Sequence, residues 1–347
     1  MSHNILITGA SGYLGGTLLA RWSSANLPAY HKLYALIRKN EQGEAVKQYG
    51  AEPILFDIKD EASIKAAIID KEITIIYFLI DAMTSEAQVP MIQALAEVKA
   101  KTGREVHFLH TSGAKLFSSH AGHPTDRTIP DDDVSLWELQ KTSQPRYGVA
   151  SKGLDANNTV IETAEAHGVR SYIFIPCIVY GKGEGFGNPI SIQTVAIVKA
   201  AKKLGRVYKP DADHHTWPVS HVVDNALLYL EIMRNILSDQ NIGFGKNGYY
   251  LAASGSVSWN DLYCAMARGL AKRKVIETDE VSLVDDAVLE KMGAALGCPK
   301  DMVPLFLGGD CTLQARNGRK IGWRPQFPEE HILEMADEEV DIILQNS

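Results

Sequence analysis

Three glycines near the start of the chain have the spacing and the setting of a phosphate-binding turn. Gly9, Gly12 and Gly15 are spaced G-x-x-G-x-x-G, directly after an apolar run and directly before a predicted helix. Glycine lets the backbone turn tightly and approach a pyrophosphate, and the N–H groups of the following helix favour its negative charge. The pattern predicts a dinucleotide-binding turn, and an ordinary glycine-rich turn is the alternative.

Two cations follow the second apolar run of the chain. Arg38 and Lys39 come directly after Leu36 and Ile37, at the place where NAD-binding proteins carry an acidic residue for the ribose hydroxyls. A guanidinium can bind a phosphate through two parallel hydrogen bonds, and the neighbouring ammonium adds charge. The pair predicts NADP(H) as the cofactor, unless both residues are ordinary solvated cations.

The elements that must position these residues alternate between apolar strands and helices. Strands are expected at 5–7, 33–37, 53–56, 73–80, 106–109 and 170–175, and helices at 13–24, 62–69, 85–101 and 153–167. Apolar strands that alternate with helices indicate a parallel sheet covered on both faces. The expected fold is α/β, a Rossmann-type doubly wound parallel sheet with a smaller C-terminal substrate lobe.

The pattern of the chain changes after Pro176. Four glycines fall within 181–187, and we interpret this segment as a loop that leaves the sheet. The dinucleotide-binding domain is expected at 1–180, with a return segment at about 218–250. The smaller, substrate-binding lobe is expected at 181–217 and 251–347.

Several segments, taken in order, resemble the extended and atypical short-chain dehydrogenases/reductases, the NAD-dependent epimerase/dehydratase-like family. The glycine spacing is theirs, and so are the segments Phe56–Asp60, Pro176–Gly183, Ser220–Ala226 and Gly322–Pro325. Single segments are modest evidence, but their shared order along nearly the whole chain is specific. The tyrosine region described below resembles fungal-type atypical members.

The resemblance implies which residues form the site. The first aspartate of the Phe56–Asp60 segment would bind the adenine amino group, and the Pro176–Gly183 segment would run beside the nicotinamide. The expected cofactor-binding residues are Gly9, Ser11, Gly12, Tyr13, Leu14, Arg38, Lys39, Asp57, Ile58, Leu79, Lys152, Pro176, Ile178 and Val179.

The same resemblance implies a catalytic hydroxyl residue, a tyrosine and a lysine: Ser112, Tyr147 and Lys152. The tyrosine would exchange a proton with the substrate oxygen, and a nearby ammonium would lower its pKa. Thr111 is the second candidate for the hydroxyl, and an alternative alignment places Gly113 there.

The spacing of Tyr147 and Lys152 departs from the family's Y-x-x-x-K. Lys152 follows Tyr147 by five positions instead of four, which on a regular helix turns their side chains about 140° apart instead of about 40°. Pro145 and Gly148 favour a tyrosine that stands at or just before the helix start, facing the nicotinamide pocket, and a bulge in the first turn would also realign the pair. The alternative is a structural Tyr147 in a catalytically altered relative.

Composition limits the class of protein. The net charge of −7, from 35 basic and 42 acidic side chains, argues against nucleic-acid binding by bulk electrostatics. The N-terminus runs directly into a predicted strand, and no apolar run has the length of a membrane span. We expect a cytoplasmic monomer or homodimer that binds a small-molecule substrate, without nucleic-acid or membrane partners.

The remaining polar residues predict no metal site. The cysteines Cys177, Cys264, Cys298 and Cys311 contain no C-x-x-C pair, so free thiols are expected. The histidine pairs His120/His123 and His214/His215 lack acidic or cysteine ligands at metal spacing. His120 and His123 are expected to border the substrate, and the run 131–133 of three aspartates is interpreted as a solvated loop.

The sequence favours an NADP(H)-dependent oxidoreductase that reduces a carbonyl, or oxidises an alcohol, of a small organic substrate. One alternative is an epimerase or dehydratase of the same family, for which the basic residues Lys199, Lys202, Lys203 and Arg206 could bind a nucleotide-linked substrate, if they are not a solvated helix face. The other alternative is a non-catalytic NADP-binding redox sensor.

Overall fold

The computed structural model describes residues 2–212 and 215–347 and is built around one parallel sheet of seven strands. The strand order is β11-β7-β5-β4-β1-β2-β3. In chain order the strands are β1 (Asn4–Ile7), β2 (Lys32–Leu36), β3 (Glu52–Ile54), β4 (Ile75–Phe78), β5 (His107–Thr111), β7 (Arg170–Pro176) and β11 (Tyr249–Ala252). β1, β4 and β11 are buried throughout, as apolar strands covered on both faces must be.

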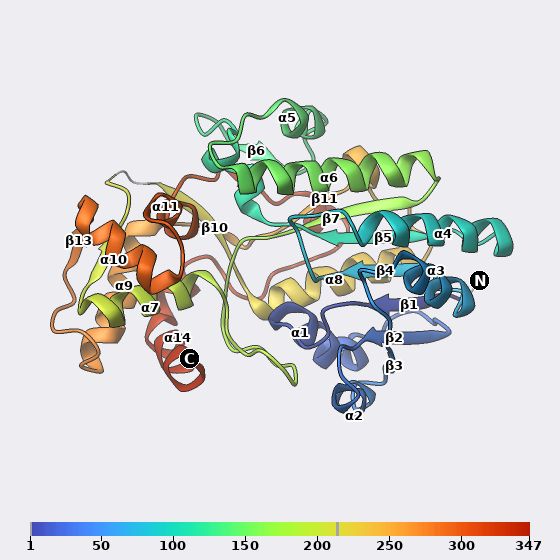
Figure 1. The fold of residues 1–347 in the computed structure, drawn as a ribbon, viewed down its shortest axis with the longest axis horizontal. Helices are drawn as coiled ribbons and strands as arrows, with labels where there is room; N and C mark the ends of the chain where they lie inside the picture. Colours follow the sequence, from blue (N-terminus) through green and yellow to red (C-terminus); the bar gives the residue numbers. More distant parts are fainter. Residues whose placement is uncertain (1, 213–214) are drawn as a thin grey trace.

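Helices cover both faces of this sheet, so the expected Rossmann-type fold is confirmed (Figure 1). On one face α1 (Tyr13–Trp22) packs against α8 (Val222–Leu237), and on the other α4 (Gln88–Thr102) lies between α3 (Glu61–Asp70) and α6 (Gly148–Ala166). The short helix α2 (Glu41–Lys47), which the sequence pattern did not predict, packs against β3. Because the strands are parallel, the carboxyl ends of β1, β4 and β5 lie along one edge of the sheet. Ligands of such folds bind outside these ends.

A second group of elements lies beyond this edge (Figure 1). Its helices are α7 (Gln193–Leu204), α9 (Trp259–Lys272), α10 (Asp286–Leu296), α11 (Val303–Leu307) and α14 (Ala336–Asn346). Its strands are β8 (Ile178–Tyr180), β10 (Thr216–His221) and β12 (Gly255–Ser258) in one small sheet, and β9 (Val207–Lys209) and β13 (Val281–Leu283) in another. The remaining short elements are α5 (Leu136–Thr142), α12 (Asn317–Lys320), α13 (His331–Glu334) and the pair β6 (Ile129–Pro130) and β14 (Leu313–Gln314).

The segment after β14 returns to the sheet side of the molecule. α12 packs against β11 and α8, and the indole of Trp323 donates a hydrogen bond of 3.0 Å to the carbonyl of Asp224. The Asp224 carboxylate accepts hydrogen bonds from the backbone N–H groups of Gln326 and Phe327. The chain between 313 and 327 is therefore attached to the face of the sheet that α8 covers.

The interpretation of 131–133 as a solvated run is wrong for its first residue. Asp131 is 1% exposed, and its carboxylate accepts backbone hydrogen bonds from Arg316 (2.7 Å), Asn317 (2.8 Å) and Leu251 (2.9 Å). Three aspartates in a row resemble a surface run in composition, but the partners of Asp131 are distant in the sequence. This carboxylate links the β6 loop to β11 and to the C-terminal segment.

Candidate functional site

The turn after β1 requires glycine at two of its three positions. Gly9 has φ +68°, and a Cβ there would lie 2.6 Å from the carbonyl oxygen of Leu79. A Cβ on Gly15 would lie 2.3 Å from the carbonyl oxygen of Gly9. The N–H of Gly12 donates to that same carbonyl at 2.8 Å, and Gly12 is the residue that precedes α1. The expected glycine turn is therefore present, and it holds the start of α1 against the end of β4.

The glycine-rich segment at 181–187 packs directly on this turn. A Cβ on Gly185 would lie 2.4 Å from the Cα of Gly16, and a Cβ on Gly187 would lie 2.1 Å from the carbonyl oxygen of Ser11. The N–H of Asn188 donates to the Ser11 carbonyl at 3.0 Å. The segment leaves the sheet as expected, and its glycines allow backbone-to-backbone contact with the phosphate-binding turn.

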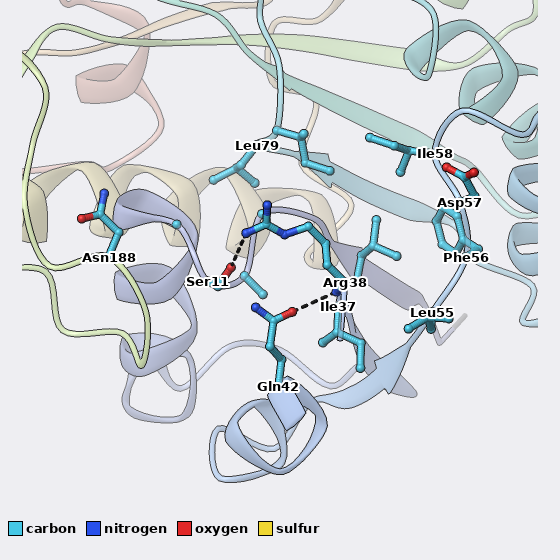
Figure 2. Close-up of a pocket in the computed structure, with 15 residues that line it drawn as sticks. Ser11, Ile37, Arg38, Gln42, Leu55, Phe56, Asp57, Ile58, Leu79 and Asn188 are labelled. Carbon is cyan, nitrogen blue, oxygen red and sulfur yellow. Dashed lines mark hydrogen bonds between the residues drawn. The ribbon is translucent and has the colours of Figure 1, made fainter. Parts of the chain in front are cut away.

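A cavity of about 640 Å³ opens beside the turn (Figure 2). Its lining comes from the glycine turn, the end of β2, the segment after β3 and the end of β4: Gly9, Ala10, Ser11, Gly12, Leu36, Ile37, Arg38, Gln42, Leu55, Phe56, Asp57, Ile58, Leu79, Ile80 and Asn188. The volume lies in the range of small-molecule and cofactor sites. β4 ends at Phe78, two residues earlier than expected, which leaves Leu79 and Ile80 free to line this cavity.

Arg38 is the cation of this cavity. Its guanidinium Nη2 lies 3.5 Å from the hydroxyl of Ser11, and the side chain is exposed at the rim. Within the described part of the chain, no carboxylate forms an ion pair with Arg38. Gln42 accepts hydrogen bonds from the backbone N–H groups of Arg38 (2.9 Å) and Lys39 (3.3 Å), whereas the Lys39 side chain does not line the cavity. Arg38 therefore keeps its donors available for an anion.

A second cavity, of about 460 Å³, lies next to the first. The two cavities share Gly9, Gly12, Leu79 and Asn188. Of the residues expected to bind cofactor, Tyr13, Leu14, Pro176 and Val179 line this second cavity. Ile178 is fully buried and, like Lys152, lines neither cavity.

Ser112 presents an unpartnered hydroxyl to the second cavity. The residue lines the cavity, and its Oγ is buried without a hydrogen-bond partner. The Oγ1 of Thr111 is instead 2.7 Å from the hydroxyl of Tyr229, so its hydrogen bond is already made. Gly113 also lines the cavity but has no side chain to contribute. Ser112 is therefore the hydroxyl residue that remains available to a ligand.

The expected tyrosine and lysine are not brought into this cavity. Tyr147 stands immediately before α6, as predicted, but its hydroxyl is buried without a partner and its ring lies 5.5 Å from the ring of His120. Lys152 is exposed. The buried face of α6 carries Ala150 and Gly153, and one residue of helix rotates a side chain by about 100°. The extra residue therefore turns Lys152 outward, and Ser112, Tyr147 and Lys152 do not share one cavity.

His120, His123 and His215 line neither of these two cavities. His120 is buried, with Nε2 2.8 Å from the carbonyl oxygen of Gly308. His123 is buried with no partner for either ring nitrogen, and burial lowers its pKa to about 4. The expectation that His120 and His123 border the substrate stays a prediction. His214 lies outside the described residues.

The other candidate residues named from the sequence are the basic residues on and after α7 and the four cysteines. The lysines at 199, 202 and 203 are on the exposed face of α7, and Arg206 bonds Ser282 and Glu280. The four cysteines are free thiols. Among the residues the structure describes, no cluster of His, Cys, Asp and Glu is arranged to hold a metal ion. Within the same residues, no helix has the length and hydrophobicity needed to cross a membrane.

Sequence reasoning missed most of the side chains that shape the second cavity. They come from loops and from distant elements, and include Met83, Lys115, Trp217, Gln193 and Phe306. Lys115 follows Ser112 by three residues, in a short 3-10 turn at 114–117. A single lysine in a loop has no spacing signal, so the sequence could not have singled it out.

The sequence is similar to those of known proteins. The sequence profile of the NAD dependent epimerase/dehydratase family matches residues 5–243. The chain is 21% identical to the oxidase ucsJ of an Acremonium species, over 94% of each protein.

Two solved structures share the fold. UDP-glucose 4-epimerase from Thermotoga maritima, solved with UDP-glucose, has a TM-score of 0.64 at 14% identity, over 99% of both chains. The dTDP-glucose 4,6-dehydratase DesIV from Streptomyces venezuelae, solved with NAD and TYD bound, has a TM-score of 0.65 at 14% identity, over 99% of this chain and 97% of that one.

The chain belongs to the NAD dependent epimerase/dehydratase family. It is a member of the extended short-chain dehydrogenase/reductase class, and its cofactor is a nicotinamide dinucleotide.

Proposed function

We propose that this protein is an NADP(H)-dependent oxidoreductase that reduces a carbonyl, or oxidises an alcohol, of a small organic substrate. The observation that supports it best is that the two cavities are neighbours, because Gly9, Gly12, Leu79 and Asn188 line both of them. One ligand can extend from the Arg38 side of the first cavity, past the glycine turn, into the second. Its far end would then lie in the cavity that presents the Ser112 hydroxyl.

The residues of the first cavity fit a phosphorylated dinucleotide. The glycine turn leaves space for a pyrophosphate at the start of α1, and Arg38 would bind the second phosphate. Asp57 would accept from the adenine amino group. Pro176 and Val179 would lie beside the nicotinamide, which supplies or accepts a hydride when the cofactor is bound.

Ser112 would hold the substrate oxygen. A buried hydroxyl without a partner is costly, and a ligand oxygen in the second cavity would satisfy it. Such a hydrogen bond orients the carbonyl and stabilises charge that develops on its oxygen.

Cofactor choice gives a direct test with a matched control. NADPH should bind at least about tenfold more tightly than NADH, about 1.4 kcal/mol, because no described carboxylate forms an ion pair with the Arg38 guanidinium. Arg38→Asp should invert the order, since a carboxylate repels the phosphate. Lys39→Ala should leave the ratio nearly unchanged, because that side chain lies outside the cavity. Fluorescence titration of both cofactors measures this, and equal affinities in the parent protein would contradict the proposal.

The reaction class needs a second experiment. NADPH absorbance is followed with a broad panel of carbonyl compounds, and net oxidation with one of them supports the oxidoreductase. An epimerase or a redox-neutral dehydratase would return the cofactor to its starting state, so substrate would change without net NADPH consumption. A sensor would bind NADPH and change no compound. Ser112→Ala should lower turnover of an accepted carbonyl while NADPH affinity stays the same.

A further inference from the structure

The second cavity is largely apolar. Aliphatic, aromatic and thioether side chains form most of its wall. They come from the loop after β4, the turn after β5, β8, the segment before α7, β10 and α11: Leu79, Ala82, Met83, Leu116, Val179, Ile190, Ile192, Trp217 and Phe306. The polar groups that join them are few, among them Ser112, Ser191 and Gln193. A wall of this kind binds a ligand chiefly by removing its apolar surface from water.

One cation faces this apolar wall. Among the described residues that line the cavity, Lys115 is the one with a charged side chain. Its ammonium lies 4.8 Å from the centre of the Phe306 ring, and no carboxylate within residues 2–212 and 215–347 forms an ion pair with it. Burial lowers the pKa of Lys115 to about 8. A half-buried ammonium that lies over an aromatic ring, with no carboxylate partner among the described residues, is available to bind an anion.

The neighbouring helix α6 presents a glycine, and no cation, toward this part of the cavity wall. A Cβ on Gly153 of α6 would lie 2.7 Å from the methyl groups of Leu116 and 3.2 Å from the methyl carbon of Met83. These two side chains line the cavity, so they occupy the space that a longer α6 side chain would need. Lys152, which precedes Gly153 on the helix, is exposed.

We propose that the second cavity binds a largely apolar, preferably aromatic, small molecule that carries one anionic oxygen group, and that the Lys115 ammonium binds this group. This inference deepens the proposed function, since it names the substrate class of the same site. A nucleoside diphosphate would bring two phosphate groups to a cavity with one cation. A single carboxylate matches the charge of Lys115, and the apolar body matches the wall.

Direct binding of three probes tests the inference without turnover. The probes are 2-naphthoate, its neutral carboxamide and UDP, measured by isothermal titration calorimetry with and without NADPH. At about pH 7 we expect 2-naphthoate to bind at least about tenfold more tightly than the carboxamide, in line with a charge-assisted hydrogen bond. UDP should bind more weakly than 2-naphthoate.

The preference for the anion should fade as pH rises through about 8, because Lys115 loses its proton there. The other titratable groups near it do not change charge in this range. Burial raises the pKa of Tyr13 and of Cys177 well above their ordinary values, and burial lowers that of His120. Lys115→Arg should keep the preference and remove this pH dependence, because a guanidinium stays charged.

Lys115→Met should bind 2-naphthoate and the carboxamide equally well. If Lys115→Met still binds the carboxamide, the cavity is intact. The matched control is Lys71→Met, at an exposed lysine after α3, and it should behave like the parent protein. An unchanged preference for 2-naphthoate in Lys115→Met would overturn the inference, and so would UDP as the tightest probe. NADPH titration of the same samples tests the proposed function separately, because neither result depends on the other.

Discussion

Replacing Lys115 by methionine should stabilise the folded protein. The parent side chain places an ammonium against the Phe306 ring with no carboxylate partner among the described residues. Burial lowers its pKa from 10.5 to about 8, which corresponds to about 3 kcal/mol by which folding disfavours the charged form. Because Lys115 is half-buried and faces a cavity that admits water, we expect a measured gain of about 1–3 kcal/mol near neutral pH.

The pH dependence of this gain has a definite sign. Below about pH 8 both the folded and the unfolded chain hold the proton, so the full cost of the buried charge is present. Between about 8 and 10.5 the folded protein has released the proton that the unfolded chain still binds. The stability of the parent protein relative to Lys115→Met should therefore rise with pH across this window.

Urea unfolding followed by circular dichroism, at about pH 7 and again above about pH 10, measures both effects. Lys71→Met is the control, because the Lys71 side chain is exposed and lines neither cavity. A less stable Lys115→Met at neutral pH, or a difference that does not change with pH, would refute the reasoning that this ammonium is buried and unpaired.

Three further variants separate cofactor binding, catalysis and stability. Gly12→Val should abolish NADPH binding with near-parent circular dichroism, because Gly12 lines both cavities and a valine side chain would occupy the pyrophosphate site. Normal NADPH binding in a fluorescence titration would show that the cofactor does not bind at this turn. Tyr147→Phe should keep turnover within about twofold. It should leave the free energy of unfolding unchanged or raise it by up to about 1 kcal/mol, because it removes a buried hydroxyl without a hydrogen-bond partner. A 100-fold loss of turnover would restore Tyr147 as the proton donor. Asp131→Ala should lower the free energy of unfolding by at least about 3 kcal/mol, because three backbone N–H groups lose their acceptor. Urea unfolding measures this loss, and a value below about 1 kcal/mol would show that the links to β11 and the C-terminal segment are weak.

The sequence by itself determined the fold and the cofactor turn, because both depend on local signals. An apolar strand, a glycine spacing and a helix start are written within about fifteen consecutive residues of the chain. Arg38 was found for the same reason, since it follows the second strand directly. The start of α6 next to Tyr147 was also predicted, from Pro145 and Gly148.

The tertiary structure alone decided which side chains face the second cavity. The wall combines Met83, Lys115, Trp217 and Phe306, which come from four separate parts of the chain, and no local pattern relates them. The rotation of α6 about its axis was likewise decided by packing. α6 packs against the turn at 114–117 with Gly153 facing Leu116 and Met83, and Lys152 is left exposed. Asp131 has the composition of a surface run but is buried by partners more than a hundred residues away. Side-chain direction depends on which surfaces meet, and that is set by long-range packing instead of by neighbouring residues.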